Sequence, residues 1–131
     1  MDLMIFASSG NSIRKKLVEK LGMMLDRTSQ WEDIDSLPEL KAALHRPRSF
    51  STIVVLAVSD PLELSAILAL GPWLEDYRLI VILPGDEKET VSQAHILRPR
   101  YLSFADSPLD DVAAVLAKMM RREGFASALG E

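Results

Sequence analysis

Three aspartates, Asp60, Asp86 and Asp106, stand shortly after runs of apolar residues. If those runs end at one edge of a sheet, the three carboxylates share that edge, and clustered oxygen ligands suit a hard cation such as Mg²⁺. Each aspartate also stands just before an expected helix start, where a carboxylate can accept hydrogen bonds from free backbone amides. We favour helix capping for all three and keep the cation site as the alternative.

A hydroxyl-rich turn is the second candidate site. It consists of Ser8, Ser9, Gly10, Asn11 and Ser12, between an apolar run and a helical pattern. Hydroxyls and backbone amides at a helix start can hold an anion without any cation. The same residue types also form an ordinary turn and helix cap, so both interpretations stay open.

The histidines and the paired arginines give weaker signals. His45 and His95 have no second metal ligand nearby in the sequence, so we interpret both as helix-surface residues. Two Arg-Pro clusters precede apolar runs and contain Arg46, Arg48, Arg98 and Arg100. In an acidic chain these cations fit helix ends and solvated loops better than a nucleic-acid patch. With no cysteine and no Gly-x-Ser-x-Gly turn, the sequence gives thiol and hydrolase chemistry no support.

The composition describes one globular domain over residues 1–131. A hydrophobic fraction of 48% allows a core of the size that a single domain of this length needs. The 15 Lys and Arg against 19 Asp and Glu give a net charge of −4, which favours neither a disordered chain nor a nucleic-acid partner. The longest pure apolar run, Ile53–Val58, is too short for a membrane span, and the acidic start does not resemble a signal peptide. We expect a soluble, cytoplasmic protein without membrane contact.

Hydrophobic periodicity predicts strands and helices in strict alternation. The predicted strands are Leu3–Ala7, Met23–Leu25, Ser51–Val58, Leu79–Leu83 and Tyr101–Ala105. The strand at Met23–Leu25 has the weakest pattern. The predicted helices are Ser12–Leu21 with Gly22 as its stop, Leu37–His45 with Ser36 as its cap, Pro61–Asp76 with a break near Gly71, Glu87–Leu97, and Leu109–Arg122.

This alternation predicts an α/β fold. Apolar runs without polar alternation, such as Ser51–Val58, are typical of parallel strands that are covered on both faces. Right-handed crossovers then give a single doubly wound five-stranded parallel sheet of flavodoxin-like order 2-1-3-4-5, with helices on both faces. Ligands of such sheets bind beyond the carboxyl ends of the strands. Any site should therefore use the loops that follow Ala7, Val58, Leu83 and Ala105.

The layout resembles the receiver domain of two-component response regulators, from Leu3 to about Arg122. Ile53–Pro61 is similar to a receiver's third strand with the proline that follows it, and Tyr101–Ala105 is similar to its fifth strand. The resemblance implies a phosphoacceptor aspartate, an acidic pair that holds Mg²⁺, a hydroxyl that reads the phosphate, and a lysine that pairs with it. Phosphoryl transfer depends on this placement of charge.

Every one of these positions departs from the family's pattern. The phosphoacceptor position is Ala57, the acidic pair falls on Ala7 and Ser8, the hydroxyl position on Pro84 and the lysine position on Phe104, followed by Ala105 where the family has proline. The resemblance thus implies the fold, while the residues predict no phosphoryl transfer, no metal and no cofactor. Asp60 is the alternative phosphoacceptor if the register is shifted.

We expect a non-enzymatic signalling or regulatory domain that acts through contact with a protein partner. In the family, the fourth helix, fifth strand and fifth helix carry the signal, and Tyr101 matches an aromatic switch position on that surface. Tyr101 would then be an anchor, with Gln93, Arg100, Lys118 and Arg122 at its rim. An equal alternative is that Tyr101 only closes the edge of the sheet.

The segment Ile5–Ser12 is also similar to the phosphate loop of flavodoxins. This similarity implies an alternative function, a small module that binds an anion, a nucleotide or the phosphate of FMN through residues 8–12. Ala7 stands where that family prefers a hydroxyl, and no aromatic pair for the flavin ring follows the third or fourth predicted strand. We therefore place this alternative second.

Overall fold

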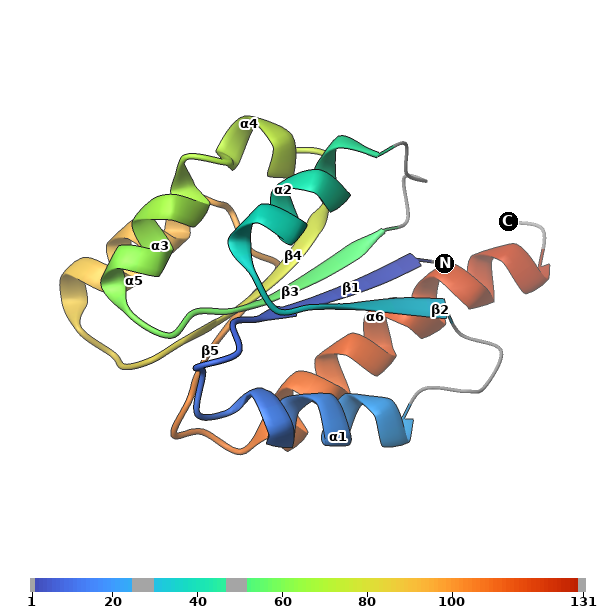
Figure 1. Cartoon of the computed structure of the whole chain (residues 1–131). Coiled ribbons are helices and arrows are strands. Elements are labelled where there is room, and N and C mark those ends of the chain that lie inside the picture. The colour runs from blue at the N-terminus through green and yellow to red at the C-terminus, as the bar shows by residue number, and fades with distance from the viewer. Residues whose placement is uncertain (1, 25–29, 47–51, 130–131) are drawn as a thin grey trace.

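The computed structural model describes residues 2–24, 30–46 and 52–129. Its sheet has five parallel strands in the order β2-β1-β3-β4-β5, which confirms the predicted flavodoxin-like topology (Figure 1). The strands are β1 (Asp2–Ala7), β2 (Gln30–Ile34), β3 (Ile53–Ala57), β4 (Arg78–Leu83) and β5 (Tyr101–Phe104). The helices are α1 (Arg14–Met24), α2 (Leu37–His45), α3 (Pro61–Leu68), α4 (Gly71–Leu74), α5 (Lys88–His95) and α6 (Leu109–Leu129).

The sheet separates two hydrophobic layers. Side chains alternate between the faces of a strand, so Phe6 and Leu56 pack in one layer while Ile5 and Val55 pack in the other. Figure 1 shows α2, α3, α4 and α5 on the first face and α1 and α6 on the second. Every residue of β3 is buried, as the prediction of a central strand without polar alternation requires.

The second strand lies elsewhere than predicted. Met23 and Met24 belong to α1, which continues through Gly22, and Met23 is 85% exposed. A glycine inside a helix lowers helix stability by about 1 kcal/mol relative to alanine, and the neighbouring helical turns can offset this loss. Leu25 lies outside the described residues. Strand β2 instead occupies Gln30–Ile34, where the sequence predicts neither strand nor helix, because an edge strand can direct charged side chains to solvent.

Helix starts confirm two predicted caps and correct a third. The Ser36 hydroxyl accepts a hydrogen bond from the Glu39 amide at 3.3 Å, and the Asp60 carboxylate accepts one from the Glu63 amide at 2.8 Å. The N-cap residue of α5 is Glu87, without a side-chain cap bond, so the predicted capping by Asp86 is wrong. Capping by Asp106 stays a prediction.

The predicted break near Gly71 is real and produces the short helix α4. A proline at the second position of α4 lacks the amide that would continue the α3 hydrogen-bond ladder. Of the helices in residues 2–24, 30–46 and 52–129, none combines the length and apolar character that a membrane crossing needs.

Candidate functional site

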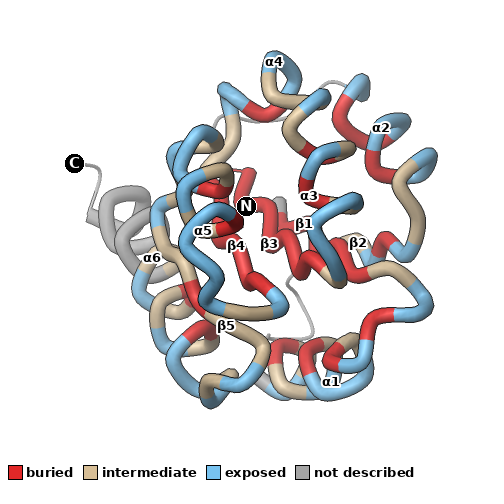
Figure 2. Tube along the Cα trace, turned by 90° about the vertical axis from the view of Figure 1, so that its left-hand side faces the viewer, coloured by how far each residue is buried: buried red, intermediate tan, exposed pale blue. Residues whose placement is uncertain are grey.

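The predicted loops meet along the edge where the parallel strands end. Figure 2 views the molecule onto this edge, with the buried strands in the middle and exposed loops around them. Ala7 at the end of β1 is the register partner of Ala57 at the end of β3. Ala57 is in turn the register partner of Ile82 in β4, which places three strand ends side by side.

The two strand ends at the centre of this edge carry buried apolar residues. Ala7 and Ala57 are fully buried and pack in the same layer, against α1 and α6. Phe104 is half-buried and packs in the opposite layer, while Pro84 is exposed and Ser8 is half-buried. The structure thus brings the two alanines together and places Phe104 in the opposite layer, so the five positions that the resemblance singled out do not pack as one group.

Asn11 ties the hydroxyl-rich turn to the end of β3. Its side chain is buried, and Nδ2 donates to the Ala57 carbonyl at 3.1 Å. The side-chain oxygen accepts a hydrogen bond from the Ile13 amide at 3.0 Å, which holds the start of α1. Because both ends of the amide are used, Asn11 holds the turn beside Ala57 at the end of β3.

Two amides of the turn also have internal acceptors. The Ser9 amide donates to the Asp35 carbonyl at 3.2 Å, and the Asn11 amide donates to the Ser8 carbonyl at 2.9 Å. An anion at this turn would depend on the remaining amides and on the hydroxyls of Ser8, Ser9 and Ser12. Fewer backbone amides of the turn are therefore available to an anion than the sequence suggested.

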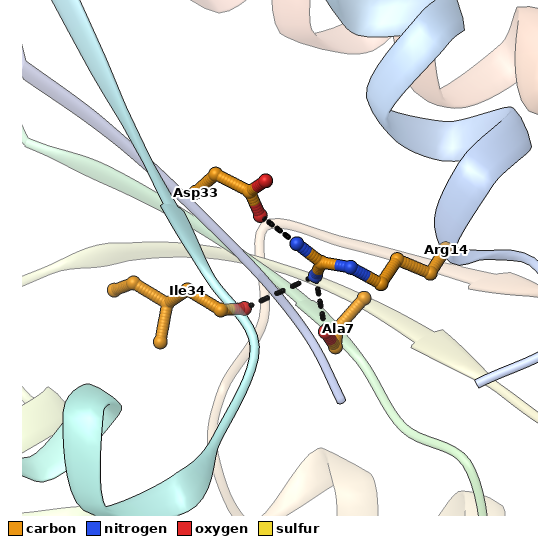
Figure 3. A network of polar contacts seen from close by, with 4 residues as sticks. All are labelled: Ala7, Arg14, Asp33 and Ile34. Atoms are coloured by element: carbon orange, nitrogen blue, oxygen red, sulfur yellow. Dashed lines mark hydrogen bonds and ion pairs between the residues drawn. The ribbon is translucent and has the colours of Figure 1, made fainter. Parts of the chain in front are cut away.

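Arg14 forms the main polar network at this edge (Figure 3). Nη1 donates to the Ala7 carbonyl and, at 3.4 Å, to the Ile34 carbonyl, while Nη2 pairs with the Asp33 carboxylate. The Arg14 side chain is 20% exposed and that of Asp33 is 39% exposed. The guanidinium therefore joins the ends of β1 and β2 and places a fixed positive charge beside the acidic-pair position.

Sequence reasoning missed this role of Arg14. Arg14 is not among the candidate site residues of the sequence, and Asp33 lies outside the predicted strands and helices. An arginine at a helix start is a weak signal alone, because its partners come from β1 and β2 and depend on the fold.

A cavity of about 470 Å³ lies beside the turn. Its lining includes the turn residues Ser9, Asn11 and Ser12, the apolar Val18, two cations and two carboxylates. The charged members are Arg14, Lys15, Glu19 and Asp33. The cavity therefore has balanced charge, with Arg14 already paired to Asp33.

The three aspartates do not form a cation site. Across residues 2–24, 30–46 and 52–129, no group of three or more Asp, Glu or His side chains is placed to hold a metal ion. Asp60 instead caps α3, where Glu63 also accepts a hydrogen bond from the Ser59 amide at 2.9 Å. The alternative of a displaced cation site on Asp60, Asp86 and Asp106 is thus wrong for this structure.

The histidines and arginines lie at helix ends and surfaces. His45 and His95 are exposed, and the His45 ring centroid lies 3.7 Å from that of Trp73. Arg46 pairs with the Glu32 carboxylate at 2.6 Å. Arg98 and Arg100 are exposed at the opposite edge, where strands begin, and Arg48 lies outside the described residues.

The expected partner surface flanks the edge strand β5. Gln93 lies on α5 and Lys118 on α6, on opposite faces of the sheet, with exposed Arg100 just before β5. Tyr101 is half-buried and packs in the layer that contains α1 and α6. The side chain of Arg122 lies outside the described part. The four placed residues surround one edge, and Tyr101 has its ring partly covered.

Comparison with known proteins supports the fold and does not by itself assign a function. No protein-family description matches the chain, and no curated protein matches it in sequence. Among solved structures it is similar to a response regulator protein from Burkholderia pseudomallei, whose crystal structure contains a phosphorylated aspartic acid, a calcium ion and citrate. The TM-score is 0.64 at 14% identity, over 99% of this chain and 74% of that one. The chain therefore has a receiver-like, flavodoxin-like fold.

Proposed function

We propose that this protein is a receiver-like signalling domain that accepts no phosphoryl group and acts through contact with a protein partner. The observation that carries the proposal is the pair Ala7 and Ala57, two buried alanines in register at the ends of β1 and β3. A methyl group has no lone pair to attack phosphorus and no oxygen to hold a divalent cation.

The polar contacts around the alanines support the same proposal. Asn11 donates to the Ala57 carbonyl, and the Arg14 guanidinium donates to the Ala7 carbonyl. These bonds satisfy backbone oxygens at the strand ends without a metal ion. They also hold the turn and the first helix in one arrangement, independent of any phosphodonor.

An edge that accepts no phosphoryl group limits how the domain can signal. A ligand shifts a conformational equilibrium only as far as its affinities for the two states differ. Without a phosphoryl group or its cation, the domain has no such differential contact at this edge. We infer that one conformation dominates and that Gln93, Arg100, Tyr101 and Lys118 offer a constant contact surface.

Intact-mass spectrometry tests the phosphoryl part of the proposal. The protein is incubated with acetyl phosphate and Mg²⁺, beside a receiver domain that retains its aspartate as the positive control. We expect no phosphate adduct on this chain. A stable adduct on the native protein that disappears in Asp60→Ala would overturn the proposal and restore the shifted register.

The alternative function, an anion or FMN-phosphate module, has one supporting observation. The cavity of about 470 Å³ brings serines 9 and 12 together with Arg14 and Lys15. A titration with inorganic phosphate and with FMN, followed by calorimetry, distinguishes the two functions. We expect no flavin colour in the purified protein and no saturable FMN heat. A saturable signal lost in Ser9→Ala would favour the alternative.

A further inference from the structure

A second cavity lies at the edge opposite the candidate site. It has a volume of about 640 Å³ and is formed by the end of α3, by α4 and its following turn, and by the end of α5 with the loop that leads to β5. In Figure 1, α4 follows α3 at the end away from the carboxyl edge of the sheet. We call it the α4 cavity.

The α4 cavity has both apolar and polar walls. Leu74 is buried in the core, and Leu68, Tyr77 and Leu97 are half-buried and pack against that core. Ile96 is 69% exposed at the cavity, which is unusual for a large aliphatic side chain in this protein. An apolar body could therefore cover Ile96 and fill space of this volume.

The charges at the α4 cavity are unbalanced. Glu75 and Asp76 contribute two carboxylates and Arg98 one guanidinium, which leaves one net negative charge. The C-terminal end of a helix adds negative partial charge. Helices α2 and α5 carry His45 and His95 in their last turns, whereas α3 has no basic residue in its last turn. The end of α3 thus lacks a cation of its own.

Arg98 serves a different helix end. It follows α5, and its amide donates to the His95 carbonyl at 3.0 Å. Its backbone φ is +53°, a left-handed conformation that often closes a helix. Arg98 is exposed and follows the C-terminal end of α5, where a positive charge is favourable. Among the residues that line the cavity, Arg98 is the only cation beside two carboxylates and the end of α3, which favours binding of a further cation.

We propose that the α4 cavity binds a basic side chain, arginine or lysine, that a partner protein presents on an apolar segment. The carboxylates of Glu75 and Asp76 and the end of α3 attract the cation, while Ile96 and Leu68 contact the apolar flanks. A cavity of about 640 Å³ is larger than one guanidinium group needs, so neighbouring residues of the partner share it. This surface is separate from the carboxyl edge and does not depend on whether that edge accepts phosphoryl.

Two short peptides serve as probes, followed by ¹⁵N-HSQC spectra of the full chain. The first is acetyl-leucyl-arginyl-isoleucine amide, and the second replaces arginine by glutamine at similar length. We expect saturable shifts at the amides of Tyr77, Leu97 and Arg98 with the arginine peptide. The glutamine peptide should bind at least about fivefold more weakly, the ratio expected for one partly exposed charge pair.

Variants that remove negative or positive charge from the cavity should change the peptide affinity in opposite directions. Glu75→Gln with Asp76→Asn should weaken the arginine peptide about fivefold, and Arg98→Asn, which tolerates a positive φ, should strengthen it about twofold. Asp86→Asn with Glu87→Gln makes the same change in charge at the opposite edge and should have no effect. Gly71→Leu adds a side chain at the cavity wall, where a Cβ meets no neighbouring atom within 4 Å, and should block binding without unfolding.

Three results would overturn the proposal. The first is equal binding of the two peptides, and the second is the absence of saturable shifts at Tyr77, Leu97 and Arg98 at millimolar peptide. The third is binding of n-butylammonium chloride as tight as that of the arginine peptide, because the occupant would then be a free amine. None of these three results changes the outcome that we expect from the phosphodonor experiment.

Discussion

The two edges of the sheet differ in how their polar groups are satisfied. At the carboxyl edge, Asn11 and Arg14 bond the carbonyls at the ends of β1 and β3, around two buried alanines. At the amino edge, the α4 cavity retains two carboxylates, one guanidinium and an exposed isoleucine. At the edge expected to be functional, the backbone carbonyls at the ends of β1 and β3 are thus bonded by side chains of this chain, whereas the α4 cavity places two carboxylates beside an exposed aliphatic side chain.

Ala57→Asp should produce the largest change in this comparison. The new carboxylate is buried beside Ala7, and the Arg14 guanidinium at this edge is already paired with Asp33. We expect a loss of at least about 3 kcal/mol in the free energy of unfolding at pH 7, measured by urea denaturation. The matched control is Ala114→Asp on the exposed face of α6, which should cost far less.

Ala57→Asp also tests whether a carboxylate at position 57 allows phosphoryl transfer. Burial raises the pKa of an unpaired aspartate above its unfolded value, so its penalty is full at neutral pH and fades as pH falls and both states bind the proton. If Ala57→Asp instead kept full stability and formed a phosphate adduct, the carboxyl edge would not be closed in the way described.

Arg14→Gln should have the next largest effect. It removes charge-assisted hydrogen bonds to the Ala7 carbonyl and to Asp33, of which the first is largely shielded from solvent. We expect a loss of about 2 kcal/mol in the free energy of unfolding by urea denaturation. Lys15→Gln, one residue further along an exposed part of α1, is the control and should be nearly neutral. Equal effects of the two variants would contradict the role assigned to Arg14.

The smallest expected effect distinguishes Asp60 from Asp86, which both precede a predicted helix in the sequence. Asp60→Ala removes the cap of α3 and should cost about 1 kcal/mol, whereas Asp86→Ala should change stability by no more than about 0.5 kcal/mol. Thermal unfolding followed by circular dichroism measures both. A larger loss in Asp86→Ala than in Asp60→Ala would show that the β4–α5 loop has a structural role not described above.

The strand order was predictable because it depends on a strong signal. Continuous apolar runs in Ile53–Ala57 and Leu79–Leu83 predict buried parallel strands, and alternation with helices then restricts the topology. Strand β2 was missed because its charged residues, Glu32 and Asp33, lie at the sheet edge, where packing does not demand an apolar pattern.

The contacts of the site were harder to predict than its location. The loops after the strands were correctly placed at one edge, yet the bonds of Asn11 to Ala57 and of Arg14 to Ile34 join residues 46 and 20 positions apart. Such pairs follow from register and helix orientation, which a single sequence does not specify. The α4 cavity was missed for the same reason, since its walls come from three separate segments.

The most direct test of the closed carboxyl edge is an HSQC titration with Mg²⁺ and acetyl phosphate, read at the amides of Ala7, Ala57, Ser59 and Ser103. We predict that these resonances stay in place, apart from the small unsaturable shifts that salt produces, and that no second set of peaks emerges. Saturable shifts or a second set of peaks at these residues would show that the edge binds its signal and changes state, which would contradict the central claim.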